Sequence, residues 1–112
     1  MVFYLKDFLD ILYMEDYVIC IPSADRDHII NNKTCCFLRN QDIPMSKVYV
    51  FVPERCYEEY KKKFYSYPEI NLIIGKEGIR AQRKAISDYF NEGQFVVSMD
   101  DDIAAVNELK YV

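Results

Sequence analysis

At 112 residues the chain has the size of one domain, which leaves no room for a second and is near the lower limit for a sheet covered by helices on both faces. Hydrophobic residues make up 51% and charged residues 29% of the sequence, so the composition excludes disorder and favours a globular domain. The net charge of −4 excludes a broad basic surface for nucleic acid, and any bound anion has to be met by a local group of side chains.

The first predicted element is an amphipathic helix within residues 1–16, because Leu5, Phe8 and Leu9 recur at helical spacing. Charged residues interrupt this segment before it reaches the length of a signal peptide or a membrane span. We therefore expect no targeting or transmembrane segment. The apolar stripe is expected to pack on the domain, with a dimer contact as the alternative.

Strand-like and helix-like segments then alternate through a core at residues 17–103, and a short segment at 104–112 follows. Continuous apolar runs predict strands at 17–23, 47–53, 71–75 and 94–102. Helical spacing of apolar residues predicts helices at 25–41, 55–67 and 77–93, the last one capped by Gly93. This order predicts a single α/β domain with three α/β/α layers and a mainly parallel, Rossmann-like sheet of about four strands.

The four cysteines predict neither a zinc site nor a disulfide framework. They have no C-x-x-C spacing, Cys35 and Cys36 are adjacent, and Cys20 lies in a predicted buried strand. We expect an intracellular, reducing location.

Polar residues follow every predicted strand at its carboxyl end, where ligands bind in open parallel sheets. These groups are residues 23–26, 53–55, 76–80 and 100–102. We expect them to converge on one site.

Three consecutive aspartates end the fourth predicted strand. In an extended segment Asp100 and Asp102 face the same side, whereas Asp101 faces away. The pair is a candidate ligand set for Mg²⁺ or Mn²⁺, which would bridge to the diphosphate of a nucleotide sugar. The alternative is a solvated acidic turn that caps a following helix.

A second candidate group lies on the third predicted helix, where Arg80, Arg83 and Lys84 are three and four residues apart. Guanidinium groups bind phosphate through paired hydrogen bonds, so both arginines are candidate diphosphate ligands. The alternative is a solvated helix face that pairs with Glu77 or Asp88.

A third group follows the first strand and contains Pro22, Ser23, Asp25 and Arg26. Asp25 is a candidate acceptor for a nucleobase or ribose, and Arg26 is a candidate ligand of phosphate or base. The alternative is that Asp25 or Ser23 caps the next helix. By contrast, the aromatic stripe that includes Tyr60 is assigned to the core.

In combination these segments resemble the GT-A glycosyltransferases of family 2 type, and especially the TET-associated group allied to base J glucosyltransferase. The matching stretches are VICIPSADRD, MSKVYVFVP, GKEGIRAQRKAISDYF and FVVSMDDDI, within residues 17–103. The resemblance implies a UDP-sugar donor, an Asp-x-Asp metal motif at Asp100 and Asp102, and nucleotide contacts from Pro22, Arg26 and the arginines of the third helix.

The sequence departs from the family at three positions: Ala24 and Asp25 replace a Tyr-Asn pair, and Lys84 stands where Asn follows the arginine. The family's second half, which supplies the acceptor site and the catalytic base, has no counterpart here. We therefore expect the donor-binding half of a metal-dependent glycosyltransferase, acting on a modified DNA base, a protein or a glycan.

The alternative function is a non-catalytic module that binds a nucleotide or a partner chain. A half-domain of this kind is expected to expose the edge of its fourth strand. A homodimer or a companion chain would cover that edge.

Overall fold

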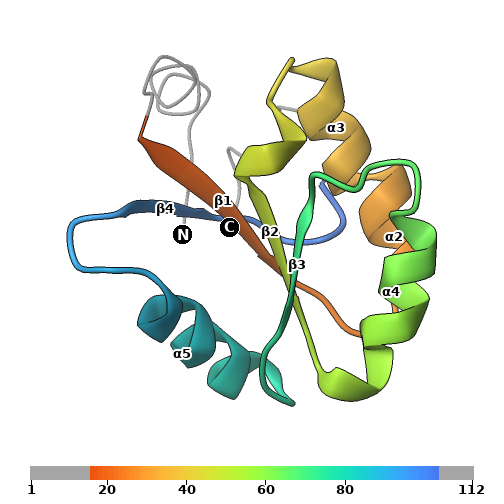
Figure 1. Cartoon of the computed structure of the whole chain (residues 1–112). Helices are drawn as coiled ribbons and strands as arrows, with labels where there is room; N and C mark the ends of the chain where they lie inside the picture. Colours follow the sequence, from red (N-terminus) through yellow and green to blue (C-terminus); the bar gives the residue numbers. More distant parts are fainter. Residues whose placement is uncertain (1–15, 104–112) are drawn as a thin grey trace.

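Residues 16–103 are described by the computed structural model, and they form a four-stranded, all-parallel sheet between two layers of helices (Figure 1). The strand order is β3-β2-β1-β4. The strands are β1 (Tyr17–Pro22), β2 (Val48–Val52), β3 (Asn71–Ile74) and β4 (Phe95–Ser98). The predicted α/β class and Rossmann-like layering are confirmed. The helix predicted before Asp16 and the segment 104–112 lie outside the described residues.

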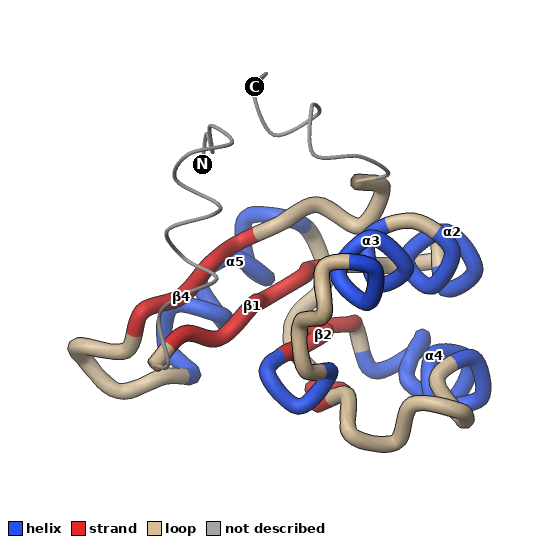
Figure 2. Tube along the Cα trace, turned by 90° about the horizontal axis from the view of Figure 1, so that it is seen from above, coloured by secondary structure: helices blue, strands red, loops and turns tan. Residues whose placement is uncertain are grey.

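Alternate side chains of the strands enter two separate cores, as expected for strands buried on both faces. Ile19 and Val50 belong to the larger core, which α2 (Asp27–Asn32), α3 (Thr34–Asn40) and α4 (Tyr57–Lys63) cover. Cys20 and Phe51 belong to the smaller core under α5 (Ile79–Tyr89). Figure 2 shows α5 and the other helices on opposite faces of the sheet. Burial of each large aliphatic side chain contributes about 1.5–3 kcal/mol.

The register brings the carboxyl ends of the strands to one edge of the sheet. Sheet-like hydrogen bonds continue one residue past three strands: Ser23 N donates to Phe51 O at 3.0 Å, Gly75 N to Val52 O at 2.8 Å and Met99 N to Cys20 O at 3.1 Å. The loops after all four strands therefore begin beside one another.

The helix predicted at 25–41 is two helices, because the backbone breaks at Lys33 with φ −112° and ψ −85°. Asn31 and Asn32 precede the break, and asparagine competes with helical hydrogen bonding through its side chain. The break also brings Thr34, the first residue of α3, to a position where its hydroxyl contacts the loop after β4. A tertiary contact thus outweighs the apolar spacing that predicted one helix.

Two predicted ends in the last part of the chain were also wrong. The helix α5 ends at Tyr89 and Phe90 is already extended, so Gly93 is not its cap. Gly93 instead has φ 94° in the following turn, which Gln94 N closes by donating to Asn91 O at 3.2 Å. The strand β4 ends at Ser98, four residues earlier than predicted.

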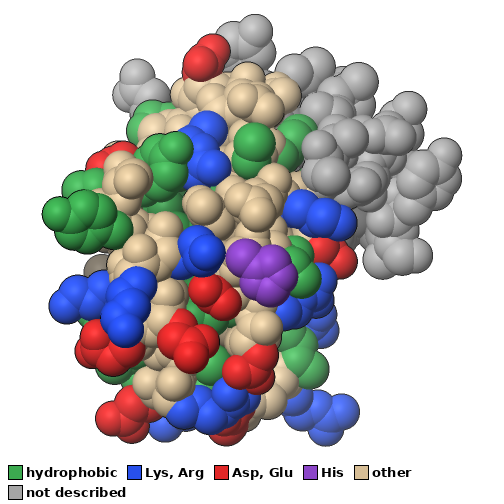
Figure 3. All heavy atoms as spheres, turned by 90° about the vertical axis from the view of Figure 1, so that its right-hand side faces the viewer, with side chains coloured by type: hydrophobic (Ala, Val, Ile, Leu, Met, Phe, Trp, Pro, Cys, Tyr) green, Lys and Arg blue, Asp and Glu red, His purple; other side chains and the backbone are tan. Residues whose placement is uncertain are grey.

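β4 forms one edge of the sheet in residues 16–103, as expected, and its first residue Phe95 is 43% exposed. Coverage of this edge by a second copy or a companion chain stays a prediction. Within the same residues no helix combines the length and apolarity that a membrane crossing requires. The face that carries α2 and α4 mixes acidic and basic side chains around the histidine (Figure 3).

All four cysteines are free, and two of them are unreactive by position. Burial raises the pKa of Cys20 and of Cys35 to about 12, so both stay neutral thiols. We expect iodoacetamide at pH 8 to label the partly exposed Cys36 and to spare Cys20 and Cys35 until urea unfolds the chain. Peptide mapping by mass spectrometry checks this order. Labelling of Cys20 as fast as Cys36 would contradict the packing of β1.

Candidate functional site

A pocket of about 430 Å³ opens at the carboxyl edge of the sheet, within the usual range of about 300–1,000 Å³ for ligand sites. The loops after all four strands contribute to it. Its walls include Ser23 after β1, Pro53 after β2, Glu77 after β3 and Asp101 after β4. The convergence predicted from the sequence is confirmed.

A chain of hydrogen bonds holds Asp101 in one wall of this pocket. Ser23 Oγ donates to Asp101 Oδ2 at 2.7 Å, and this uses the only hydrogen of the hydroxyl. Tyr60 Oη therefore donates to Ser23 Oγ at 2.6 Å, while it accepts a hydrogen bond from Arg26 N at 3.0 Å. Arg26 Nη1 lies 3.3 Å from Asp101 Oδ1, so Asp101, Ser23, Tyr60 and Arg26 form a closed ring of contacts, which we call the circuit. Burial raises the pKa of Tyr60, which keeps this hydroxyl a neutral donor.

The aspartates lie in a turn, so the extended geometry predicted for residues 100–102 was wrong. The buried hydroxyl of Thr34 holds this turn, because it donates to Asp100 O at 2.6 Å and accepts from Ile103 N at 2.9 Å. Asp101, predicted to face away, is instead the buried member of the three, with 6% exposure. Asp100 is exposed, and Asp102 Oδ2 lies 3.4 Å from Arg26 Nη2.

All three aspartates line the pocket, but they do not form a closed metal cage. Within residues 16–103 no group of three or more His, Cys, Asp or Glu side chains is placed to hold a metal ion. Asp100 and Asp102 can supply two oxygen ligands. Mg²⁺ commonly binds through one or two carboxylates and completes its coordination with water and substrate phosphate. Asp100 and Asp102 are of the ligand type that such an ion uses, and Asp102 is also ion-paired with Arg26.

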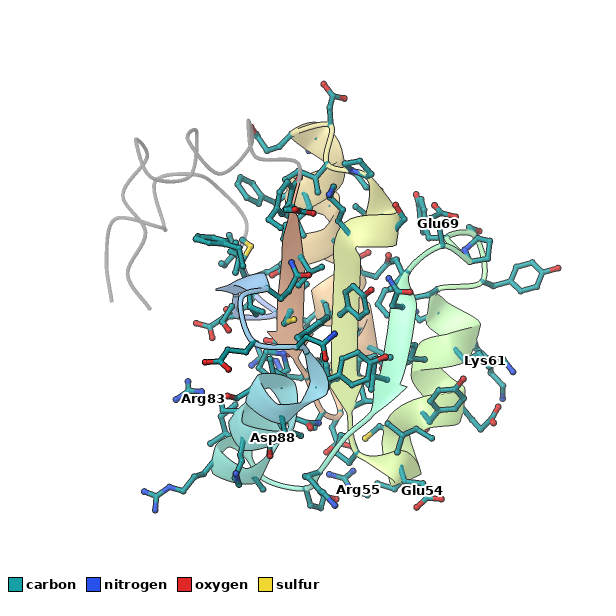
Figure 4. The ribbon with its side chains drawn as sticks, turned by 60° about the vertical axis from the view of Figure 1, so that its left-hand side comes forward. Glu54, Arg55, Lys61, Glu69, Arg83 and Asp88 are labelled. Atoms are coloured by element: carbon teal, nitrogen blue, oxygen red, sulfur yellow. The ribbon has the colours of Figure 1, made fainter. Side chains whose placement is uncertain are left out.

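The basic residues of α5 lie outside this pocket. Arg83 lines a different groove between α5 and β4, and Figure 4 shows its side chain pointing away from the helix. Arg80 is exposed and is not part of the pocket wall. Lys84 Nζ lies 3.2 Å from Asp88 Oδ2, which matches the alternative of a solvated, ion-paired helix face. The grouping of these three residues as phosphate ligands therefore gains no support from their positions.

Asp25 also lies outside the pocket, in a cluster of charged residues at its rim. Arg55 Nη1 donates to Asp25 Oδ1 at 2.7 Å, and the same guanidinium makes two hydrogen bonds to Glu77. Arg55 holds the pKa of Asp25 below its ordinary value. Figure 4 shows Arg55 beside the loop between β3 and α5. The sequence placed Arg55 at this rim, but its role in joining three loops was missed.

Gln82 is a wall residue that sequence reasoning also missed. It lines the pocket with 3% exposure, and its Oε1 accepts a hydrogen bond from Lys76 N at 2.7 Å. Its Nε2 has no hydrogen-bond partner within residues 16–103. A buried donor without a partner destabilises a fold by about 1–3 kcal/mol. The sequence feature that could have identified Gln82 is its position as a polar residue within the apolar stripe of Ile79 and Ile86.

Comparisons of the chain with models of protein families, with curated proteins and with solved structures gave no match. Its function is therefore inferred from the chemistry of the pocket.

Proposed function

We propose that the pocket binds a nucleoside diphosphate sugar of the UDP-sugar class together with Mg²⁺ or Mn²⁺, and that the chain is the donor-binding part of a glycosyltransferase. One observation carries the proposal: a single pocket at the carboxyl edge of a parallel sheet combines an acidic wall with an apolar wall.

The acidic wall suits the diphosphate end of such a ligand. Asp100 and Asp102 would hold the metal ion, which when bound supplies positive charge to the leaving diphosphate. Arg26 lies against Asp101 and Asp102 at the same wall. A phosphate bound at this wall would therefore receive hydrogen bonds from the Arg26 guanidinium.

The apolar wall suits the ring systems of the ligand. Pro22, Pro53 and Ile79 line the pocket, and Ile79 is 57% exposed although it is a large apolar side chain. A nucleobase packed on these residues would remove apolar surface from water, at about 25 cal/mol for each Å². The two walls thus complement the two chemically different ends of a nucleotide.

A binding module without catalysis is the second candidate, and the ion pairs of the pocket favour it. Asp101 and Asp102 pair with Arg26, and Glu77 pairs with Arg55. A general base must be free to contact the acceptor, and these three carboxylates are held by arginine side chains. Release of UDP from a UDP-sugar during incubation would identify an enzyme, whereas binding without turnover would identify the module.

The proposal predicts that UDP binds more tightly in the presence of Mn²⁺, and that the double variant Asp100→Ala, Asp102→Ala loses this effect. We expect a loss of roughly tenfold or more in affinity at saturating Mn²⁺, because the variant removes both metal ligands. Isothermal titration calorimetry with UDP, with and without Mn²⁺, measures it.

The matched control removes two carboxylates elsewhere, through Glu69→Ala and Asp88→Ala. Both residues are exposed, and neither lines the pocket. The control should bind UDP as the unchanged chain does. The proposed site would be refuted if the affinity for UDP did not change with Mn²⁺, or if both double variants lost the same amount of UDP affinity.

A further inference from the structure

The side-chain amide of Gln82 is fixed in the pocket wall with one end unused. Lys76 N donates to Oε1 at 2.7 Å, and this assigns the oxygen to the side of the β3–α5 loop. The other end, Nε2, carries two hydrogens and has no acceptor within residues 16–103. Nε2 is therefore a buried donor that the fold orients but does not satisfy.

The backbone around this amide is adapted to hold it. Gly75 follows β3, and a Cβ added there would lie 1.9 Å from Gln82 Oε1. Gly75 N itself donates a hydrogen bond to Val52 O at 2.8 Å, so the glycine cannot move aside without breaking this bond to β2. Only a residue without a side chain lets the amide lie against the end of β3.

Gln82 lies beside the apolar wall of the pocket, next to Ile79. It lies one helical turn after Ile79, so both residues face the same side of α5 and line the pocket together. The aspartates and Arg26 come from the loops after β4 and β1. In the proposed complex the phosphates contact Arg26 and the metal ion, and the base packs on Ile79 beside Gln82.

We propose that Gln82 determines which base the pocket accepts, by donating from Nε2 to a carbonyl oxygen on the edge of the nucleobase. This inference rests on the proposed function. It specifies a nucleoside diphosphate whose base has a carbonyl group, rather than an amino group, at that edge. An amino group there would face the Nε2 hydrogens donor to donor.

UDP and CDP test the inference, since CDP has an amino group where UDP has a carbonyl oxygen. We expect the unchanged chain to bind UDP roughly tenfold more tightly than CDP in calorimetry with Mn²⁺ present. The substitution Gln82→Glu keeps the shape and the Lys76 contact but replaces the donor with an acceptor. It should bring the ratio of UDP to CDP affinity to one or below.

A second variant, Gln82→Met, removes both polar ends without adding charge and should bring the ratio close to one. The control Gln41→Glu makes the same change outside the pocket and should keep the preference for UDP. Thermal melting confirms that each variant is folded.

Equal affinities for UDP and CDP in the unchanged chain, or a preference that survives in Gln82→Met, would overturn the role of Gln82. The donor site would still stand in either case if binding depends on Mn²⁺, Asp100 and Asp102. Absence of any nucleotide binding would overturn the proposed function and this inference together.

Discussion

Replacement of Asp101 with leucine is expected to lower the free energy of unfolding by about 3 kcal/mol. The substitution leaves the hydroxyl of Ser23, which is 7% exposed, without its acceptor, and an unsatisfied buried group destabilises by about 1–3 kcal/mol. It also breaks the ion pair with Arg26, whose side chain is 43% exposed, so solvent screening limits that part of the loss to about 1 kcal/mol. Urea denaturation followed by circular dichroism measures the difference.

Two further variants separate burial from charge at this wall. Asp101→Asn keeps an oxygen that accepts from Ser23 and loses the charge and the oxygen that faces Arg26, so we expect about half of the effect. Asp102→Leu removes the exposed partner of Arg26 and should change the stability by less than about 0.5 kcal/mol. If Asp101→Leu and Asp102→Leu were equally mild, the circuit of Tyr60, Ser23 and Asp101 would not hold this wall.

The layers and the converging loops were predictable because they depend on local patterns. Continuous apolar runs predicted strands buried on both faces, and Ile19 and Cys20 do enter opposite cores. Strands that alternate with helices form parallel sheets, and their carboxyl ends share one edge. The rim groups at residues 23–26 and 100–102 therefore met as expected, although they are far apart in the sequence.

The positions of single side chains at the site were not predictable, because contacts between distant residues decide them. Helical spacing showed that Arg80 and Arg83 are neighbours on α5, but not which face of the helix meets the pocket. Tyr60 was assigned to the core, and its ring is fully buried there. Its hydroxyl nevertheless organises Ser23 and Arg26, which an apolar stripe in a sequence cannot reveal.

The predicted ends of helices and strands were wrong for the same reason. One contact links the turn at residues 100–102 to the break at Lys33. In this contact the hydroxyl of Thr34 binds the backbone of Asp100 and Ile103. These partners are 66 and 69 residues from Thr34 in the sequence. Apolar spacing predicted an uninterrupted helix, and an apolar run predicted a longer strand. The hydrogen bonds of one buried threonine outweighed both patterns.

The substitution Thr34→Val should therefore lower the free energy of unfolding by about 2–3 kcal/mol and weaken the binding of UDP with Mn²⁺. Valine has the shape of threonine and leaves no cavity, but it leaves Asp100 O and Ile103 N without their partner. The aspartate turn then loses the contact that holds it against α3. Urea denaturation and calorimetry with UDP measure the two effects.

Thr34→Ser is the control, because serine keeps the hydroxyl and removes only the methyl group. We expect Thr34→Ser to bind UDP as the unchanged chain does and to lose only about 1 kcal/mol of stability, the usual contribution of one buried methyl group. This comparison isolates the hydrogen bonds, since valine keeps the methyl group and serine keeps the hydroxyl. If valine were tolerated as well as serine, the turn would be held by its own backbone, and Asp100 and Asp102 would owe their position to β4 alone.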